Sequence, residues 1–343
     1  MRAAVFHGPE DIRIEEVPEP ELPTGGVVIR TVATGICGSD LRTYRFGHPK
    51  IKGSQILGHE VAGIIEQSDV DTLPVGTRVA VAPGTPCLEC GWCRRGRQNM
   101  CTSRTLLGRE LPGGLAEKFA LSAQAVRAGT IVPVPDGLDL VHAPVAEPLN
   151  AVLNGQDRAR TGAYDTVLVL GLGPIGVLHI ATARARGAAR VIGVDPLASR
   201  VETAAAMLGD KDLITMEGDW LEELVRQTGG FDVVVLANTA PQAFATAMQA
   251  VKNQGRVLVF AGLPKTTPTV PVDLNEVHYR EVEIIGAFGA TPGHFAAAVE
   301  WLNEGHIDLN AFVTDRIALD DIVTGFDNVA NGVGVKTMVV FPS

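Results

Sequence analysis

The segment from Asp165 to Asp195 constrains the fold of this chain most strongly. It consists of a largely apolar run over 166–170, the glycine-rich sequence 171–176, an alanine-rich stretch, and a second apolar run that ends at Asp195. This order predicts a buried strand, a tight turn, a helix and a second strand. A βαβ unit of this kind binds a dinucleotide.

The glycine-rich turn has the residue types that a pyrophosphate site requires. Its first glycine allows the tight turn, its second lets the backbone approach the phosphates, and its third allows close packing of the helix on the sheet. The helix N-terminus offers unpaired N–H groups to the anion, and a proline in the first helical turn loses nothing by lacking one. The predicted cofactor-binding residues of the turn are Gly171, Gly173, Pro174, Ile175 and Gly176. A glycine-rich turn of some other α/β protein is the alternative.

Asp195 predicts which nicotinamide cofactor is bound. Its carboxylate would accept hydrogen bonds from both hydroxyls of the adenine ribose and repel a 2′-phosphate, so NAD is expected rather than NADP. Arg200, five residues further on, either covers the adenosine or lies on a solvated helix face. Residues at or just after strand ends should line the nicotinamide side: Asn238, Gly262, Leu263 and Phe288.

The chain has 343 residues, enough for about two domains. Short β-type segments separated by Pro and Gly fill the first 145 residues or so, after which strands alternate with helices. Six such strands are typical of a doubly wound parallel sheet. They are expected at 166–170, 191–194, 212–216, 232–237, 255–261 and 282–288, with helices at 198–208, 219–227, 241–251 and 295–303 and a last strand at 336–341.

Composition argues against several classes of function. The net charge is −10 and there is no basic block, which disfavours nucleic acid as a partner. No apolar run reaches membrane-spanning length and the N-terminal residues lack a signal-peptide layout. We therefore expect a soluble, cytoplasmic protein whose partner is a small molecule.

Four of the five cysteines form the pattern C-x2-C-x2-C-x7-C: Cys87, Cys90, Cys93 and Cys101. Four thiolates so close in sequence can surround one tetrahedral zinc ion and leave no position for a substrate. We interpret the loop 87–101 as a structural zinc site. An iron–sulfur cluster and a nucleic-acid-binding zinc ribbon are the alternatives.

The fifth cysteine, Cys37, precedes a Gly-His-Glu sequence containing His59 and Glu60. One thiolate, one imidazole and one or two carboxylates can form an open metal site that keeps a position for water or substrate. Taken singly, each of these residues is more often an ordinary structural residue. Their spacing alone does not decide between the two readings.

Together, these motifs resemble the zinc-dependent medium-chain dehydrogenases. The resemblance rests on Cys37-Gly-Ser-Asp, on Gly58-His59-Glu60 with Gly63, on the four-cysteine loop and on the glycine-rich turn, and it covers essentially the whole chain. It implies a GroES-like, β-rich catalytic domain over 1–145 to which the chain returns at 290–343. A Rossmann NAD-binding domain with a six-stranded parallel sheet would occupy 146–289.

The resemblance also implies roles for individual residues. Cys37 and His59 correspond to catalytic-zinc ligands, Asp40 to the carboxylate that orients the His59 imidazole, and Ser39 to the hydroxyl that passes the substrate proton toward solvent. Alcohol dehydrogenases use a second cysteine as third ligand, and this chain has none left. In polyol and threonine dehydrogenases a Glu binds the metal or its water instead, and the Glu after the His can also be a ligand. The resemblance therefore implies that Glu147 and Glu60 are zinc ligands that exchange; a carboxylate at a helix start is the other reading of Glu147.

The sequence Glu147-Pro148 resembles polyol and threonine dehydrogenases, with two departures. Arg42 stands where those enzymes usually carry a histidine, and Arg does not shuttle protons near neutral pH. Gly289-Ala290 follows Phe288 where sorbitol dehydrogenases have an Arg-Tyr pair. Sorbitol itself is therefore not predicted.

The resemblance implies reversible, NAD-dependent oxidation of a secondary alcohol of a polyol, sugar or cyclitol to the ketone, with one catalytic and one structural zinc ion per chain. Oxidation of threonine or another amino-alcohol is the alternative within the class. A regulatory protein that binds NAD and zinc without turnover is the alternative outside it. The family further implies a homo-oligomer, a tetramer or a dimer, formed through the exposed edge of the strand 282–288.

Overall fold

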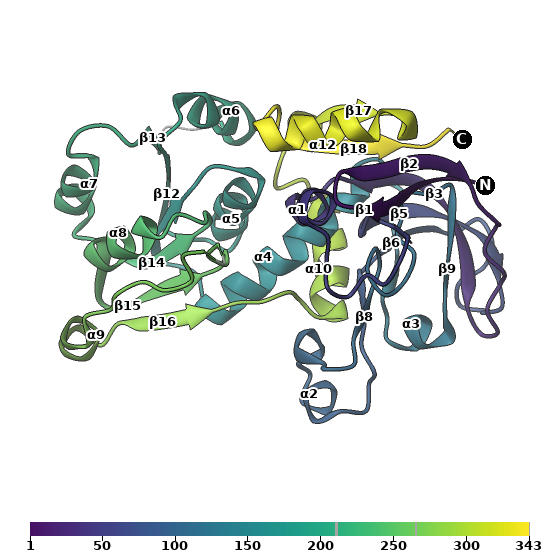
Figure 1. Ribbon diagram of the computed structural model, residues 1–343. Coiled ribbons are helices and arrows are strands. Elements are labelled where there is room, and N and C mark those ends of the chain that lie inside the picture. Colours follow the sequence, from purple (N-terminus) through teal and green to yellow (C-terminus); the bar gives the residue numbers. More distant parts are fainter. Residues whose placement is uncertain (210–211, 265, 343) are drawn as a thin grey trace. The chain divides into compact units, whose positions relative to one another are not determined.

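A computed structural model describes residues 1–209, 212–264 and 266–342, and most of its elements are labelled in Figure 1. The chain divides into two compact units. Unit 1 comprises residues 1–150, 290–305 and 309–343, and unit 2 comprises 151–289 and 306–308. The described residues contain no helix long and apolar enough to cross a membrane.

Unit 1 is built mainly from β-strands. Its largest sheet has the order β10-β6-β5-β3-β18-β17, with β9 also paired to β3. A three-stranded sheet has the order β2-β1-β4, and β7 pairs with β8. The strands are β1 (Arg2–Gly8), β2 (Asp11–Glu16), β3 (Val27–Gly35), β4 (Gln55–Ile56), β5 (Glu60–Ser68), β6 (Arg78–Val81), β7 (Gly84–Thr85), β8 (Thr105–Leu106), β9 (Lys118–Leu121), β10 (Ile131–Pro133), β17 (Val313–Ile317) and β18 (Lys336–Val340).

The helices of unit 1 are short and lie between or after these strands. They are α1 (Gly38–Phe46), α2 (Gly91–Arg94), α3 (Ala123–Arg127), α10 (Pro292–Asn303), α11 (Leu309–Phe312) and α12 (Ile322–Asn331), with 3-10 turns η1 (Gln98–Met100), η2 (Ala143–Val145) and η3 (Leu319–Asp321). Helix α10 begins three residues before the expected 295, because Thr291 caps it and its hydroxyl accepts a hydrogen bond from the His294 N–H.

The core of unit 1 sits against strands β3, β5 and β6. Alternate residues of these strands, such as Ile29, Ile65 and Val79, are fully buried and pack with Phe119. The side-chain period of two thus puts one set of residues into the core. Antiparallel pairing of β3 with β5 places Gly35 opposite Glu60, and pairing of β3 with β18 places Gly35 opposite Met338. The ends of three strands that are distant in sequence therefore meet at one place.

Unit 2 contains the predicted doubly wound sheet. Its six strands are all parallel and have the order β13-β12-β11-β14-β15-β16, in which the direction of winding reverses beside β11. The elements are β11 (Thr166–Leu170), α5 (Pro174–Ala185), β12 (Arg190–Asp195), α6 (Ala198–Leu208), β13 (Leu213–Thr215), α7 (Trp220–Thr228), β14 (Phe231–Leu236), α8 (Gln242–Ala250), β15 (Val251–Val259), α9 (Leu274–Arg280) and β16 (Glu283–Gly286). Helix α4 (Ala146–Ala159) precedes them.

Two strands, β15 and β16, differ by more than one residue at an end from the bounds expected for them. Strand β15 begins at Val251 rather than at 255, and its pairing with β14 shifts register between Phe231 and Val233. Gln254 lies in this irregular part with φ of 59°. Strand β16 is confined to Glu283–Gly286 and lies at the edge of the sheet, where one side has no partner strand among the described residues.

Candidate metal centres and nucleotide-binding turn

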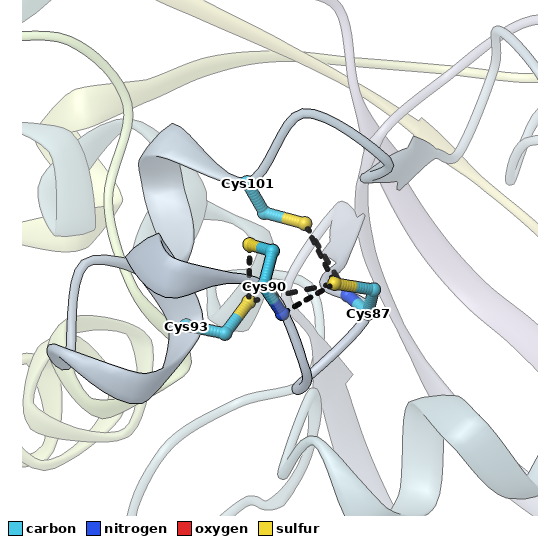
Figure 2. A group of neighbouring side chains, drawn as sticks. All are labelled: Cys87, Cys90, Cys93 and Cys101. Carbon is cyan, nitrogen blue, oxygen red and sulfur yellow. Dashed lines mark hydrogen bonds between the residues drawn. The ribbon is translucent and has the colours of Figure 1, made fainter.

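The four cysteines of the 87–101 loop converge on one point (Figure 2). Their sulfur atoms are separated by 3.5 Å between Cys87 and Cys101, 3.6 Å between Cys90 and Cys93, and 3.9 Å between Cys87 and Cys93. A tetrahedron with metal–sulfur bonds of about 2.3 Å has edges of about 3.8 Å. The four thiols therefore fit a closed, tetrahedral zinc site.

Backbone groups of the loop support this arrangement. The Cys90 N–H donates to Cys87 Sγ over 3.4 Å, and the Cys87 N–H donates to Cys101 Sγ over 3.4 Å. Cys93 and Cys101 are buried, although the loop carries only short elements, α2 and η1. A metal ion bound by the four thiols would order a loop that carries only such short elements.

A second cluster joins Cys37, His59 and Glu60, whose ligand atoms all lie within 4.8 Å of one another. Cys37 follows β3 and is the N-cap of α1, and Glu60 is the first residue of β5. A thiolate, an imidazole and a carboxylate suit zinc. Within the described part of the chain, these residues and the four-cysteine loop are the groups of three or more such ligands.

Asp40 orients the imidazole of this cluster. Its Oδ1 lies 3.0 Å from His59 Nδ1, and its Oδ2 accepts a hydrogen bond from the Cys37 N–H at 3.4 Å. Burial opposes both charges, yet the ion pair lowers the pKa of Asp40 and raises the pKa of His59. With Nδ1 engaged by Asp40, the ring directs Nε2 toward Cys37 and Ser39, as a metal-binding histidine requires.

Ser39 lies in the same cluster. Its Oγ is 3.5 Å from Cys37 Sγ and 3.5 Å from His59 Nε2. Thr43, one turn further along α1, donates its hydroxyl hydrogen to the Ser39 carbonyl oxygen over 2.9 Å and accepts a hydrogen bond from the Arg109 guanidinium over 2.9 Å. These bonds fix the first turn of α1, which carries both Ser39 and Asp40.

Glu147 lies in the first turn of α4 and is partly buried. Burial raises its pKa to about 7; Glu60 and Asp40 act in the same direction, while His59 and Lys336 oppose them. Glu147 therefore feels the charges of the cluster, but its carboxylate does not belong to the group held within 4.8 Å.

The sequence analysis did not anticipate Lys336, the first residue of β18. Its side chain is only 6% exposed, its Nζ donates to the Ile36 carbonyl oxygen over 3.0 Å, and it forms an ion pair with Glu60 Oε2. Burial opposes its charge, but Glu60 and Cys37 outweigh that effect, so the pKa of Lys336 is raised. A lysine within a largely apolar final strand was the only available signal.

In unit 2 the glycine-rich turn connects β11 to α5. Gly171 adopts φ of 106°, which side chains rarely tolerate. A Cβ on Gly176 would lie 1.8 Å from the Gly171 carbonyl oxygen, so the third glycine is needed mainly by the turn itself. Gly173 caps α5, followed by Pro174 and Ile175, and the space where its Cβ would be is open. A phosphate could therefore approach the backbone there.

Asp195 ends β12 and is almost fully buried. Its Oδ2 accepts a hydrogen bond from the Leu172 N–H and its Oδ1 accepts one from the Leu197 N–H, each over 2.9 Å. The carboxylate thus ties the glycine-rich turn to the segment that precedes α6. Arg200 on α6 is half-exposed, 3.6 Å from Asp195 Oδ2.

The residues expected to line the nicotinamide lie in unit 2, with different surroundings. Asn238 follows β14; its side-chain amide donates to the Leu170 carbonyl oxygen and its Oδ1 accepts from the Ala240 N–H, each over 2.9 Å. Gly262 and Leu263 follow β15, and Phe288 follows β16 with 67% of its surface exposed. Through its hydrogen bond to Leu170, the last residue of β11, Asn238 therefore links the segment after β14 to the end of the neighbouring strand.

Comparison with known proteins identifies the class. Residues 23–136 match the alcohol dehydrogenase GroES-like domain family, and residues 174–304 match the zinc-binding dehydrogenase family. The chain is 33% identical to a sorbitol dehydrogenase of Bacillus subtilis strain 168 over 327 residues, which is 93% of this chain and 91% of the relative.

Solved structures of dehydrogenases have a fold similar to that of this chain. A zinc-binding dehydrogenase of Sinorhizobium meliloti 1021 bound to NADP has a TM-score of 0.91 and 28% identity, with 99% of each chain covered. An alcohol dehydrogenase of Escherichia coli CFT073 complexed with NADH has a TM-score of 0.89 and 25% identity, also with 99% of each chain covered.

The protein is a zinc-dependent medium-chain dehydrogenase, as the motifs predicted. Within that family it belongs to the polyol branch and is an alcohol or polyol dehydrogenase. The non-catalytic alternative is therefore set aside.

Proposed function

We propose that this protein catalyses the reversible, NAD-dependent oxidation of a secondary alcohol of a polyol, sugar or cyclitol to the ketone. The Cys37–His59–Glu60 cluster, with Asp40 bound to His59 Nδ1, is the observation that carries the proposal. The mixed donor set fits a catalytic rather than a structural zinc ion. Such an ion would supply Lewis-acid stabilisation of charge developing on the alcohol oxygen.

The chain's own residues would bind the metal, orient the substrate and move a proton. Cys37 and His59 would hold the ion, with Glu60 and Glu147 as carboxylate ligands that exchange. Asp40 keeps the His59 tautomer fixed. The Ser39 hydroxyl would accept the proton of the alcohol and pass it toward solvent. Arg42 offers no proton-accepting atom.

Asp195 supports NAD over NADP. A second negative charge from a 2′-phosphate would be repelled by this buried carboxylate, and Arg200 already pairs with Asp195. Relatives of this fold have been solved with NADP and with NADH. Steady-state rates with each cofactor would decide: we expect kcat/KM for NAD to exceed that for NADP by at least about 100-fold, and an equal or reversed preference would contradict the proposal.

The central experiment measures formation of reduced nicotinamide with a panel of polyols, sugars, cyclitols and amino-alcohols, before and after zinc chelation. We expect turnover with a polyol or sugar that disappears on chelation and returns with zinc. Similarity to a sorbitol dehydrogenase favours hydroxyl-rich substrates over threonine. Turnover confined to an amino-alcohol would favour that alternative, and turnover that survives chelation would contradict the metal's role.

We further propose that unit 1 is the catalytic domain and holds both zinc ions, whereas unit 2 binds NAD, and that the enzyme works in the reducing cytoplasm, where free thiols persist. We also propose a homo-oligomer formed along β16. Ile284 on this edge strand is 42% exposed, and Tyr279 on the neighbouring α9 is 78% exposed. Light scattering should show a tetramer or dimer that dissociates in Ile284→Lys; an unchanged mass would place the interface elsewhere.

A further inference from the structure

Lys336 contacts the candidate catalytic metal site from the other end of the sequence. Its ammonium lies between two acceptors, the Ile36 carbonyl oxygen next to Cys37 and the carboxylate of Glu60. Glu60 is fully buried, and its other oxygen, Oε1, has no hydrogen-bond partner in the described structure. One oxygen of Glu60 therefore faces a fixed cation, and the other is free to meet a second one.

The backbone makes room for this pair. Gly35 lies on β3 between Glu60 of β5 and the start of β18, and a Cβ at this position would lie 2.0 Å from Glu60 Oε2 and 3.0 Å from Lys336 Cε. A side chain at position 35 would displace the pair. The ion pair of Glu60 and Lys336 thus depends on the pairing of the adjacent strands β5, β3 and β18.

The pair solves an electrostatic problem at an open metal site. A buried carboxylate without a partner is costly, so it would move to the nearest cation. Within the Cys37 cluster that cation would be the metal, and a firmly bound extra carboxylate would occupy the position that a catalytic zinc keeps for its substrate. Lys336 gives Glu60 a permanent alternative partner.

We propose, on the basis of the function proposed above, that Lys336 is a positioning residue that restrains Glu60 from binding the catalytic zinc permanently. It acts through Glu60, and it sets how readily this carboxylate joins and leaves the metal.

Removing the lysine charge should therefore tighten the site while slowing the enzyme. In Lys336→Met, Glu60 loses the ion-pair partner that the described structure gives it, and we expect zinc release to a chelator to slow by about tenfold or more. Alcohol oxidation should fall at the same time. In the double variant Lys336→Met with Glu60→Gln, both charges are absent, and zinc release should return to the wild-type rate or exceed it.

The test uses two readouts that do not depend on activity. The first is the rate of zinc release from the full-length protein to a coloured chelator, and the second is the visible spectrum after cobalt replaces the catalytic zinc. A change in the number of ligands shifts the cobalt bands, whereas a loss of folding stability alone does not. Lys336→Gln is the second variant, because its amide keeps a donor for the Ile36 carbonyl oxygen if the methionine variant fails to fold.

The outcomes separate this inference from the proposed function. Slower release and a shifted cobalt spectrum in the single variants, both reversed in the double variant, would support it. Unchanged or faster release with an unchanged spectrum would overturn it, provided that the wild type holds two zinc ions and oxidises alcohols. A wild type that binds only one zinc ion would overturn the proposed function as well.

Discussion

The two candidate metal centres of unit 1 are assembled in opposite ways. The four-cysteine site draws all its ligands from one loop, residues 87–101, and all are thiols. The Cys37 site draws on the ends of β3 and β5, with Lys336 of β18 beside it. A local, uniform ligand set yields a closed site that orders a loop. A mixed ligand set drawn from different strands requires the folded sheet and leaves a coordination position open for water or substrate.

The difference also appears in what surrounds each site. Backbone N–H groups donate to the sulfur atoms of the loop, and Arg104 interacts electrostatically with Cys101. Around Cys37, by contrast, Asp40, Glu147 and Lys336 all influence the charge of the ligands. We infer that the first site governs stability and the second governs activity.

The largest effect should follow from Cys37→Ser. Losing the thiolate should remove the catalytic zinc and reduce alcohol oxidation by about 10³-fold or more, because Lewis-acid stabilisation of the alcohol oxygen supplies several kcal/mol. The thermal midpoint should change by only a few degrees. Metal analysis should find one zinc ion fewer per chain. Retention of activity would break the assignment of this cluster as the catalytic site.

Cys90→Ser should give the reverse pattern. We expect loss of the other zinc ion and a fall in the thermal midpoint on the order of 10 °C, because the loop has few apolar contacts to replace the metal. Initial rates measured well below the midpoint should stay within about threefold of wild type. Cys37→Ser is the matched control, and equal losses of activity in both variants would remove the distinction between the sites.

Asp40→Asn tests the support of the assembled site. The amide keeps the shape of the side chain but lacks the charge that fixes the His59 tautomer, so affinity for the catalytic zinc should fall by about 10- to 100-fold. Competition with a chelator would measure this. Asp11→Asn, on a surface pair with Arg13, is the control and should leave affinity unchanged. Equal affinities in both variants would show that Asp40 plays no part in metal binding.

The same contrast explains what the sequence could predict. The four-cysteine loop and the glycine-rich turn are local patterns, so spacing alone indicated their geometry, and the parallel sheet followed from alternating strands and helices. The pairing of Asp40 with His59 came only through the family resemblance. Lys336 was missed because its ion pair with Glu60 depends on β18 lying beside β3. Register between distant strands is not readable from composition or spacing.

Some boundaries were missed for local reasons. The irregular start of β15 includes Gln254 in a left-handed conformation, and glutamine is a residue type that gives no turn signal.

The hydrogen bonds that Asp195 accepts from the Leu172 and Leu197 N–H groups form where a strand end meets a turn. Sequence indicated an acid for ribose binding, whereas the fold shows that the same carboxylate also fixes the glycine-rich turn.

The smallest expected effect tests how tightly the assembled site is packed. In Gly35→Ala, the new methyl group would overlap Glu60 Oε2 and press on Lys336 Cε, which should cost about 1–3 kcal/mol of unfolding free energy. Denaturant titration would measure it, with Gly8→Ala as control, because nothing lies within 4 Å of a Cβ at that position. If the Glu60–Lys336 pair moves aside to relieve the overlap, zinc release should change while stability hardly falls. If neither the stability nor the rate of zinc release changes, then β3 leaves more space around Glu60 than the fold indicates.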